Sequence, residues 1–318
     1  MSNRLEIRSS AGCNPRPTRP NRRAFFGHCL AAGAMPAIAG AGWLAGSRPG
    51  FAADKEVLPK HITPETIRAV LKGLDYLAAQ QADDGSWLTG GGQGYPVAMT
   101  GLAGTALLAH GDSPTRGKYA KTVQGAVEYL VRCATPTGLI TGPTQEGGQP
   151  MHGHGFALMF LASVYGMITK ESLRKQVQVA IRKAVTLTSQ GQSAAGGWTY
   201  GPGTGDEGSV TVTQVQALRA AHNAGFLVPR ATIEEAVKYL EKCRTPEGGI
   251  QYSLLSGGGP RIAISAAAVA TLYNAGQFEG AIATDCLKYV WDQFRSIEAW
   301  DKGGGHAFYA HLYAAQGF

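Results

Sequence analysis

Two series of similar segments alternate along the chain, and their common period constrains the fold more than any other feature. One series ends at Gln80, Cys133, Gln190, Cys243 and Gln293, which are 53, 57, 53 and 50 residues apart. The other series closes on Gly111, Gly166, Gly225 and Gly276, which are 55, 59 and 51 residues apart. Because two independent series share one period, the sequence predicts a helical repeat protein.

The two helices of each repeat differ in character. The first, as in "TIEEAVKYLEKC", has charges on one face and apolar residues at helical spacing on the other. The second, as in "ISAAAVATLYNAG", is nearly uncharged and rich in small residues, which is typical of a helix surrounded by protein and packed closely. We therefore expect each repeat to supply an outer helix and an inner helix.

Glycine marks both ends of the predicted inner helices. Gly111 and Gly225 are expected to end them as left-handed caps. In front of the inner helices, four glycines are expected to turn the chain from outer to inner helix, each beside a Trp or Ile that is predicted to wedge between repeats: Gly85, Gly138, Gly197 and Gly249.

These loops, with their Gln-x-x-x-Asp-Gly-Ser-Trp-like pattern ("QQADDGSW"), resemble those of the squalene cyclase and protein prenyltransferase superfamily. More narrowly, "HGFALMFLASVYGM", "GGWTYGPGTGDEGSVTVTQVQALRAAHNAGFLVP" and "FYAHLYAAQG" are similar to secreted bacterial prenyltransferase/squalene-oxidase-repeat proteins of the planctomycete type. The resemblance implies an all-α fold, an α/α toroid of about five helix pairs over residues 60–318. It implies no defined activity.

The N-terminus is typical of an export signal. Arg22 and Arg23 precede Phe25 and Phe26 and an uncharged run rich in Ala and Gly, as in twin-arginine signal peptides. We expect residues 1–53 to be the signal peptide and leader, with cleavage near Ala52 or Ala53 and a destination in the periplasm or cell envelope. The alternative is an uncleaved membrane anchor, but the run has little Leu and a weak transfer free energy.

The charge distribution argues against a nucleic-acid partner, and the cysteines indicate no particular function. Residues 1–53 contain seven Arg and one Glu, so they carry most of the formal net charge of +7. The remainder is nearly neutral and has no nucleic-acid motif, so we expect no nucleic-acid partner. Cys133, Cys243 and Cys286 are expected to be buried thiols, because the first two hold equivalent positions two repeats apart.

The last helix is expected to be incomplete. Aligned with the third inner helix, "FYAHLYAAQGF" stops seven residues before its expected closing glycine. The fifth helix pair is therefore predicted to be cut short at the C-terminus.

Chemistry is expected where the inner helices begin. In the implied toroid the inner helices run parallel, so their N-termini and Gly-rich loops gather at one mouth, where unpaired N–H groups favour an anion. The candidate ligand-binding residues are His152, His154, Gln214, Arg261, His306, Tyr309 and His311.

"MHGHG" is the sharpest local signal of that mouth. His152 lies where the resemblance implies a diphosphate-binding histidine, and both His152 and His154 are of the type that binds metal. The alternative is structural, with His154 packed at the start of the inner helix and His152 solvated. We expect no cofactor, and a metal ion remains an alternative only for this pair.

Signatures of the standard catalysis are missing. The helix "PRIAISAAAVATL" lacks the Asp-x-Cys zinc ligands of protein prenyltransferases, and in "FYAHLYAAQG" their histidine aligns with Ala310. No Asp-x-Asp-Asp run of squalene cyclases is present. Asp206 and Glu207 are the acidic pair placed for general acid work, together with His152; a helix N-cap is the alternative for the pair, and a salt bridge is the alternative for Arg261.

Three function classes follow. The first is an exported toroid that binds an apolar or isoprenoid-like molecule, or a protein partner, without catalysis. The second is a diverged terpene cyclase or prenyltransferase with its site at the mouth. The third, a carbohydrate-active or complement-like toroid, is disfavoured, because the thioester motif Gly-Cys-Gly-Glu-Gln and a carboxylate pair across the cavity are not found. The sequence favours the first.

Overall fold

The computed structural model describes residues 62–88, 94–142, 148–203, 205–277, 280–294 and 306–317. Backbone contacts divide the chain into two units, Met1–Val57 and Leu58–Phe318. The described residues all belong to the second unit. The twin-arginine leader expected in residues 1–53 lies outside them.

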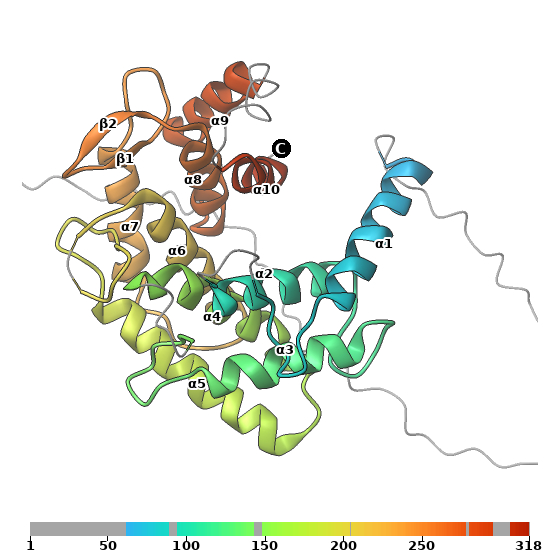
Figure 1. Ribbon diagram of the computed structural model, residues 1–318. Coiled ribbons are helices and arrows are strands. Elements are labelled where there is room, and N and C mark those ends of the chain that lie inside the picture. Colours follow the sequence, from blue (N-terminus) through green and yellow to red (C-terminus); the bar gives the residue numbers. More distant parts are fainter. Residues whose placement is uncertain are drawn as a thin grey trace, which may run out of the picture. The chain divides into compact units, whose positions relative to one another are not determined.

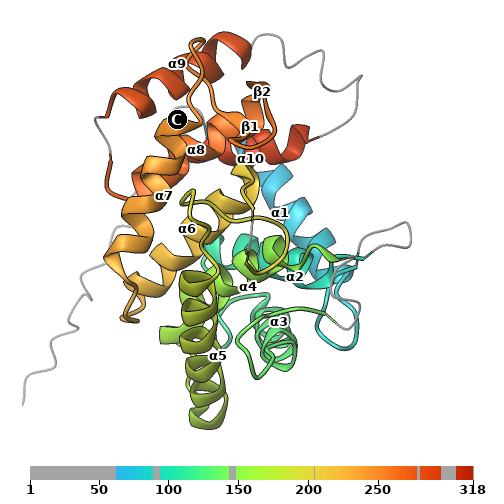
Figure 2. The ribbon, with the colours of Figure 1, turned by 90° about the vertical axis from the view of Figure 1, so that its left-hand side faces the viewer.

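Outer and inner helices alternate through the described residues. The outer helices are α1 (Pro64–Ala79), α3 (Ala120–Arg132), α5 (Glu171–Gln190), α7 (Arg230–Lys242) and α9 (Ala281–Phe294). The inner helices are α2 (Pro96–Ala109), α4 (Pro150–Val164), α6 (Gly208–Asn223), α8 (Ile262–Asn274) and α10 (Ala307–Gly317). Successive inner helices pack side by side, and outer helices pack on them (Figures 1 and 2). The prediction of an all-α fold with five helix pairs is confirmed for this part of the chain.

Small residues let the inner helices approach closely. A Cβ atom on Gly101 of α2 would lie 2.7 Å from the carbonyl carbon of Phe156 in α4. One on Gly155 of α4 would lie 2.9 Å from the amide nitrogen of Gln214 in α6. The predicted close packing is therefore confirmed at Gly101, where any larger residue would collide with the α4 backbone and push the two helices apart.

One hydrogen bond recurs where each outer helix turns into an inner helix. The backbone N–H of buried Trp87 donates to Thr100 Oγ1 at 3.1 Å, and that of buried Trp198 donates to Thr211 Oγ1 at 3.0 Å. The same bond occurs in the other two repeats, with Ile140 and His154 Nδ1 and with Ile250 and Ser265 Oγ. All four Trp and Ile residues are buried, as the predicted wedge requires.

In two of the four corners, the turn glycine comes one residue earlier than predicted. Gly85 and Gly138 have φ of +89° and +100°, as predicted, but in the other two repeats Gly196 (+96°) and Gly248 (+91°) adopt this conformation. These glycines close a tight turn, as shown by the Gly196 N–H, which donates to the Ser193 carbonyl at 2.9 Å. The glycine that follows each of them, Gly197 or Gly249, is needed for space instead: a Cβ there would lie 3.0 or 2.5 Å from a neighbouring side chain.

Left-handed glycines end most inner helices. Gly111 and Gly225 have φ of +101° and +89°, which confirms the predicted caps, and Gly276 has +84°. The end of α4 differs, because the chain continues there as the short 3₁₀ helix η2 (Tyr165–Met167) and Gly166 lies inside it.

The fourth repeat contains a hairpin that was not predicted. Strands β1 (Gln251–Ser253) and β2 (Gly257–Pro260) pair antiparallel between α7 and α8. As predicted, Cys133, Cys243 and Cys286 are buried thiols, and no disulfide joins them within the described residues. Among the helices of the described residues, none has the length and apolar character that crossing a membrane requires.

Candidate functional site

The first turns of four inner helices meet, and polar side chains gather there. His152 of α4 and Ser209 of α6 hold equivalent positions in adjacent repeats, two residues before the hydrogen-bond acceptors His154 and Thr211. Their side chains therefore face each other, with His152 Nε2 3.0 Å from Ser209 Oγ. The Tyr309 hydroxyl of α10 lies 3.4 Å from the Ser209 carbonyl oxygen, to which it donates a hydrogen bond.

Glu207 is the N-cap of α6. Its carboxylate accepts hydrogen bonds from the backbone N–H of Ser209 at 3.0 Å, from that of Val210 at 2.7 Å and from the Ser209 hydroxyl at 2.6 Å. The predicted N-cap alternative for the acidic pair therefore holds for Glu207. Burial raises the pKa of this carboxyl, although the bonds from Ser209 and Val210 and the charge of Arg261 act in the opposite direction.

His152 is neutral at physiological pH. Burial lowers its pKa to about 4, and the neighbouring charge of His306 contributes in the same direction. Since the Ser209 hydroxyl donates to Glu207, the His152 Nε2–H donates to Ser209 Oγ, and the Nδ1 atom is then an acceptor. Glu207, Ser209 and His152 thus form one hydrogen-bonded chain.

An aromatic and cationic group adjoins this chain. The hydroxyls of Tyr200 and Tyr252 lie 2.5 Å apart, and the Tyr200 ring lies 5.6 Å from the ring of His152. The guanidinium of Arg261, the N-cap residue of α8, lies 4.4 Å from the centre of the Tyr252 ring. Among the described residues no ion pair joins Arg261 to a carboxylate, so the salt bridge considered for it is not found there.

Tyr309 and His306, at the start of α10, lie beside the chain formed by Glu207, Ser209 and His152. Burial and the adjacent Tyr313 raise the pKa of Tyr309 well above its usual range, and the rings of these two tyrosines are 4.7 Å apart. His306 is exposed directly before α10 and accepts the first helical hydrogen bond from the Ala310 N–H. We call His152, Tyr200, Glu207, Ser209, Tyr252, Arg261, His306 and Tyr309 the mouth cluster.

Two candidates lie buried away from the mouth cluster. His154 is fully buried, with Nδ1 accepting from the Ile140 N–H at 3.1 Å and Nε2 2.9 Å from Thr188 Oγ1 of α5. Asp206 is 7% exposed and accepts from the Tyr239 hydroxyl, the Ser253 hydroxyl and the Leu254 N–H. Both side chains form hydrogen bonds with elements outside the mouth cluster, so we do not include them in it.

The last two candidates also point elsewhere. Gln214 is fully buried between α4 and α6, where its amide donates to the Met151 carbonyl at 2.7 Å. His311 is exposed on α10, and its Nδ1 donates to the Ala307 carbonyl at 2.7 Å. The structure thus brings together five of the nine candidate residues: His152, Glu207, Arg261, His306 and Tyr309.

Three members of the mouth cluster were missed from the sequence. Ser209 carried no signal on its own. Tyr200 and Tyr252, however, each follow by two positions the buried residue of a corner, Trp198 and Ile250. Recurrence of tyrosine at one position of the repeat was the signal that could have found them.

Metal binding finds no support in the described part of the chain. No group of three or more His, Cys, Asp and Glu side chains is arranged there to hold a metal ion. His152 Nε2 donates to Ser209 Oγ, and both nitrogens of His154 are used in hydrogen bonds. The metal alternative for this histidine pair therefore has no ligand set among these residues.

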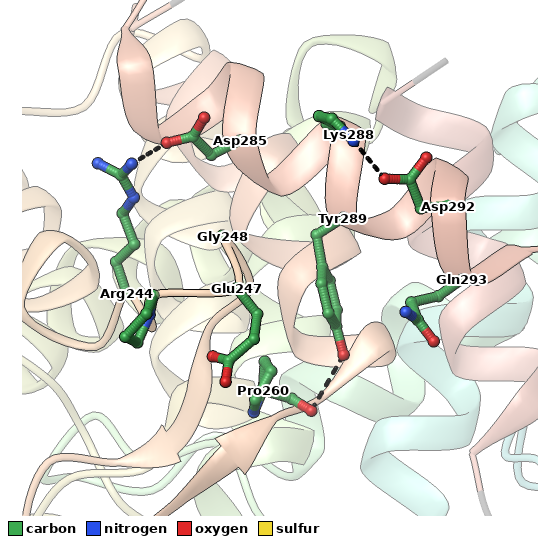
Figure 3. A pocket seen from close by; sticks show the side chains of 10 residues that line it. Arg244, Glu247, Gly248, Pro260, Asp285, Lys288, Tyr289, Asp292 and Gln293 are labelled. Carbon is green, nitrogen blue, oxygen red and sulfur yellow. Dashed lines mark hydrogen bonds and ion pairs between the residues drawn. The ribbon is translucent and has the colours of Figure 1, made fainter.

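A pocket of about 530 Å³ lies at the outer side of the fourth repeat (Figure 3). Four of its charged side chains form ion pairs, Arg244 with Asp285 and Lys288 with Asp292, and the Tyr289 hydroxyl donates to the Pro260 carbonyl. None of the candidate residues lines it. It is a surface pocket between a corner loop, the hairpin and α9, separate from the mouth cluster.

Comparison with known proteins establishes the fold and no family. No protein-family model matches the chain, and no curated protein matches it. Among solved structures, the chain is similar to the type II terpene cyclase MstE from Scytonema in complex with geranylgeranyl dihydroxybenzoate, its substrate. The TM-score is 0.50 at 16% identity, over 73% of this chain and 64% of that one.

Two further likenesses are weaker. The complex of the same cyclase with merosterolic acid A, its product, has a TM-score of 0.49 at 17% identity, over 74% of this chain and 66% of that one. A polysaccharide lyase has 0.45 at 19% identity, over 73% and 70%. The chain thus spans slightly less than two thirds of the cyclase's length. The fold is a helical toroid of the terpene cyclase type, as predicted.

Proposed function

We propose that this chain is an exported toroid that binds a small molecule with an anionic group and an apolar, isoprenoid-type body. The anionic group lies at the mouth cluster, and the body lies along the inner helices. We place the chain with the prenyltransferase/squalene-oxidase-repeat proteins that it resembles in sequence. A protein partner is the alternative occupant.

The meeting of helix N-termini beside the guanidinium of Arg261 carries this proposal. The first turns of α4, α6 and α10 touch at Ser209, and helix N-termini attract negative charge. Arg261 adds a guanidinium that is exposed and held over Tyr252 rather than paired with a carboxylate. Glu207 is the acidic residue of the cluster, and its carboxylate accepts hydrogen bonds from the first N–H groups of α6.

The apolar body follows from the inner helices themselves. Met99 and Leu102 of the inner helix α2 are apolar and only partly buried, so they can contact such a body. The terpene cyclase of the same fold was solved with a geranylgeranyl-bearing substrate, which makes this chain length the first to test.

Calorimetry with a matched pair of ligands tests the proposal. We expect geranylgeranyl diphosphate to bind, and geranylgeraniol to bind at least about tenfold more weakly, because it lacks the anion. Arg261→Gln should remove most of that difference. Arg182→Gln, an exposed arginine on the outer helix α5, is the control and should leave it unchanged. Equal binding of both ligands, or no effect of Arg261→Gln, would refute an anion site at the mouth cluster.

Acid–base catalysis is the second candidate, and the chain from Glu207 through Ser209 to His152 favours it. A carboxyl with a raised pKa next to a neutral imidazole is an arrangement suited to proton transfer. Mass spectrometry of the diphosphate after incubation distinguishes the two candidates. Recovery of the unchanged ligand supports binding without turnover. Chemical conversion of the diphosphate that is lost in Ser209→Ala, while this variant still binds the ligand, would establish that the protein is an enzyme.

A further inference from the structure

A cavity of about 630 Å³ lies at the other ends of the same inner helices. It is lined by the C-terminal halves of α4 and α6, by η2 and by one residue each from α8 and α10. Its volume falls in the range of sites for small molecules, about 300–1,000 Å³. The mouth cluster contributes none of its lining.

The chemistry of this lining is amide-rich with a single charge. Its polar side chains include Ser163, Gln216, Arg219, Asn223, Asn274 and Gln316. No carboxylate, lysine or histidine side chain of the described residues lines it. Within the described residues, no hydrogen bond or ion pair engages the guanidinium of Arg219, which is exposed to the cavity.

Several hydrogen-bonding atoms remain for a ligand. The Gln216 amide donates to Gln316 Oε1 at 3.0 Å, which leaves the Gln216 carbonyl as an acceptor and the Gln316 amide as a donor. Asn274 donates to the Ala270 carbonyl at 2.7 Å and keeps its own carbonyl oxygen. Amide donors and acceptors therefore line the same cavity as the guanidinium of Arg219.

Helix ends add acceptors to the same wall. α6 ends at Asn223 and α8 ends at Asn274, so both C-termini border the cavity, with partial negative charge on their last carbonyl groups. The carbonyls before these ends already accept N–H groups of the glycine caps, as in the bond from the Gly225 N–H to the His222 carbonyl at 3.0 Å, so the final carbonyls of Asn223 and Asn274 are the ones that favour hydroxyl donors. The dipole of α6 stabilises Arg219 one turn before its end. A simple anion would meet one favourable charge and several unfavourable dipoles, whereas a ligand with hydroxyls as well as a carboxylate would satisfy both.

We infer that this cavity binds a small hydroxylated carboxylate of the sugar-acid class. The guanidinium of Arg219 pairs with the carboxylate, in the bidentate geometry that arginine favours. The amides of Gln216, Asn223 and Gln316 and the helix carbonyls bind the hydroxyls. This site is independent of the one proposed at the mouth cluster.

Titration of the full chain with D-glucuronate, followed by ligand-observed NMR, tests the inference. Glucose carries the hydroxyls without the carboxylate, and acetate carries the carboxylate without the hydroxyls. We expect each of them to bind at least about tenfold more weakly than glucuronate. Arg219→Gln should weaken glucuronate about tenfold or more, as expected for a charge-assisted pair, and Asn223→Ala should weaken it less.

Two control variants separate the outcomes. Arg182→Gln removes an exposed arginine of α5 outside the cavity, and Arg261→Gln alters the mouth cluster; both should keep the glucuronate affinity of the unmodified protein. The inference is overturned if glucuronate does not bind, if glucose binds equally well, or if Arg219→Gln has no effect. Geranylgeranyl diphosphate binding should be unchanged in Arg219→Gln, so the two proposals fail independently.

Discussion

His154 makes the fold acid-sensitive, and a substitution there tests both its protonation state and its structural role. Its imidazole is fully buried and bridges the corner of the second repeat to α5, through the Ile140 N–H and Thr188 Oγ1. Burial lowers its pKa from 6.5 to about 4. The neutral form fits the folded chain, whereas in the unfolded chain the ring accepts a proton as the pH falls through about 6.5.

The sign of the effect follows from this difference. Because the pKa of His154 is lower in the folded state, the unfolded state binds more protons as the pH falls below about 6.5. The stability associated with the neutral ring is complete above that pH and is lost as the pH falls toward about 4. At about pH 5 the two pKa values correspond to a loss of roughly 2 kcal/mol.

Urea unfolding followed by circular dichroism at about pH 7.5 and about pH 5 measures this loss. His154→Gln keeps hydrogen-bonding atoms without a titrating ring. We expect it to be less stable at the higher pH by about 1–3 kcal/mol, because a buried bond is made less well. Its further loss on acidification should be smaller than that of the unmodified protein by roughly 2 kcal/mol. Identical losses in both proteins would refute a buried neutral His154.

Three other predictions address the corners and the leader. Gly196→Ala should destabilise the fold by about 1–3 kcal/mol in thermal unfolding, since φ is +96° and a Cβ would lie 2.3 Å from a carbonyl oxygen of α7, while Gly201→Ala, with open space, should be nearly neutral. Thr211→Val should cost about 1–3 kcal/mol in urea unfolding, because the buried Trp198 N–H loses its acceptor, and Thr211→Ser should not. Replacing Arg22–Arg23 by Lys-Lys should abolish export in cell fractionation, with accumulation of precursor as the readout; unchanged export would exclude the twin-arginine route.

Much of the mouth cluster could be predicted from the sequence, because repeat position implies spatial position. The inner helices run parallel, so residues at the start of each helix meet, and this alone predicts that His152, Glu207 and Arg261 lie together. The same reasoning did not assign Asp206, which adjoins Glu207 in sequence but is buried against Tyr239 and Ser253. A one-residue step in an extended segment reverses the direction of the side chain, and periodicity of the helices does not report that direction.

The sequence by itself determined the repeat, the alternation of amphipathic and small-residue helices and the glycine-marked corners, because each depends on local conformation and on burial at helical spacing. Only the tertiary structure decided which histidine of "MHGHG" supports a corner and which faces a site. His154 replaces the Thr or Ser of the other repeats as acceptor for a corner N–H, and His152 points to Ser209 across two helices. The pairing of Tyr200 with Tyr252, 52 residues away, and the gathering of Arg219 with amides from three inner helices were likewise decided by packing, since contacts between distant segments have no local sequence signature.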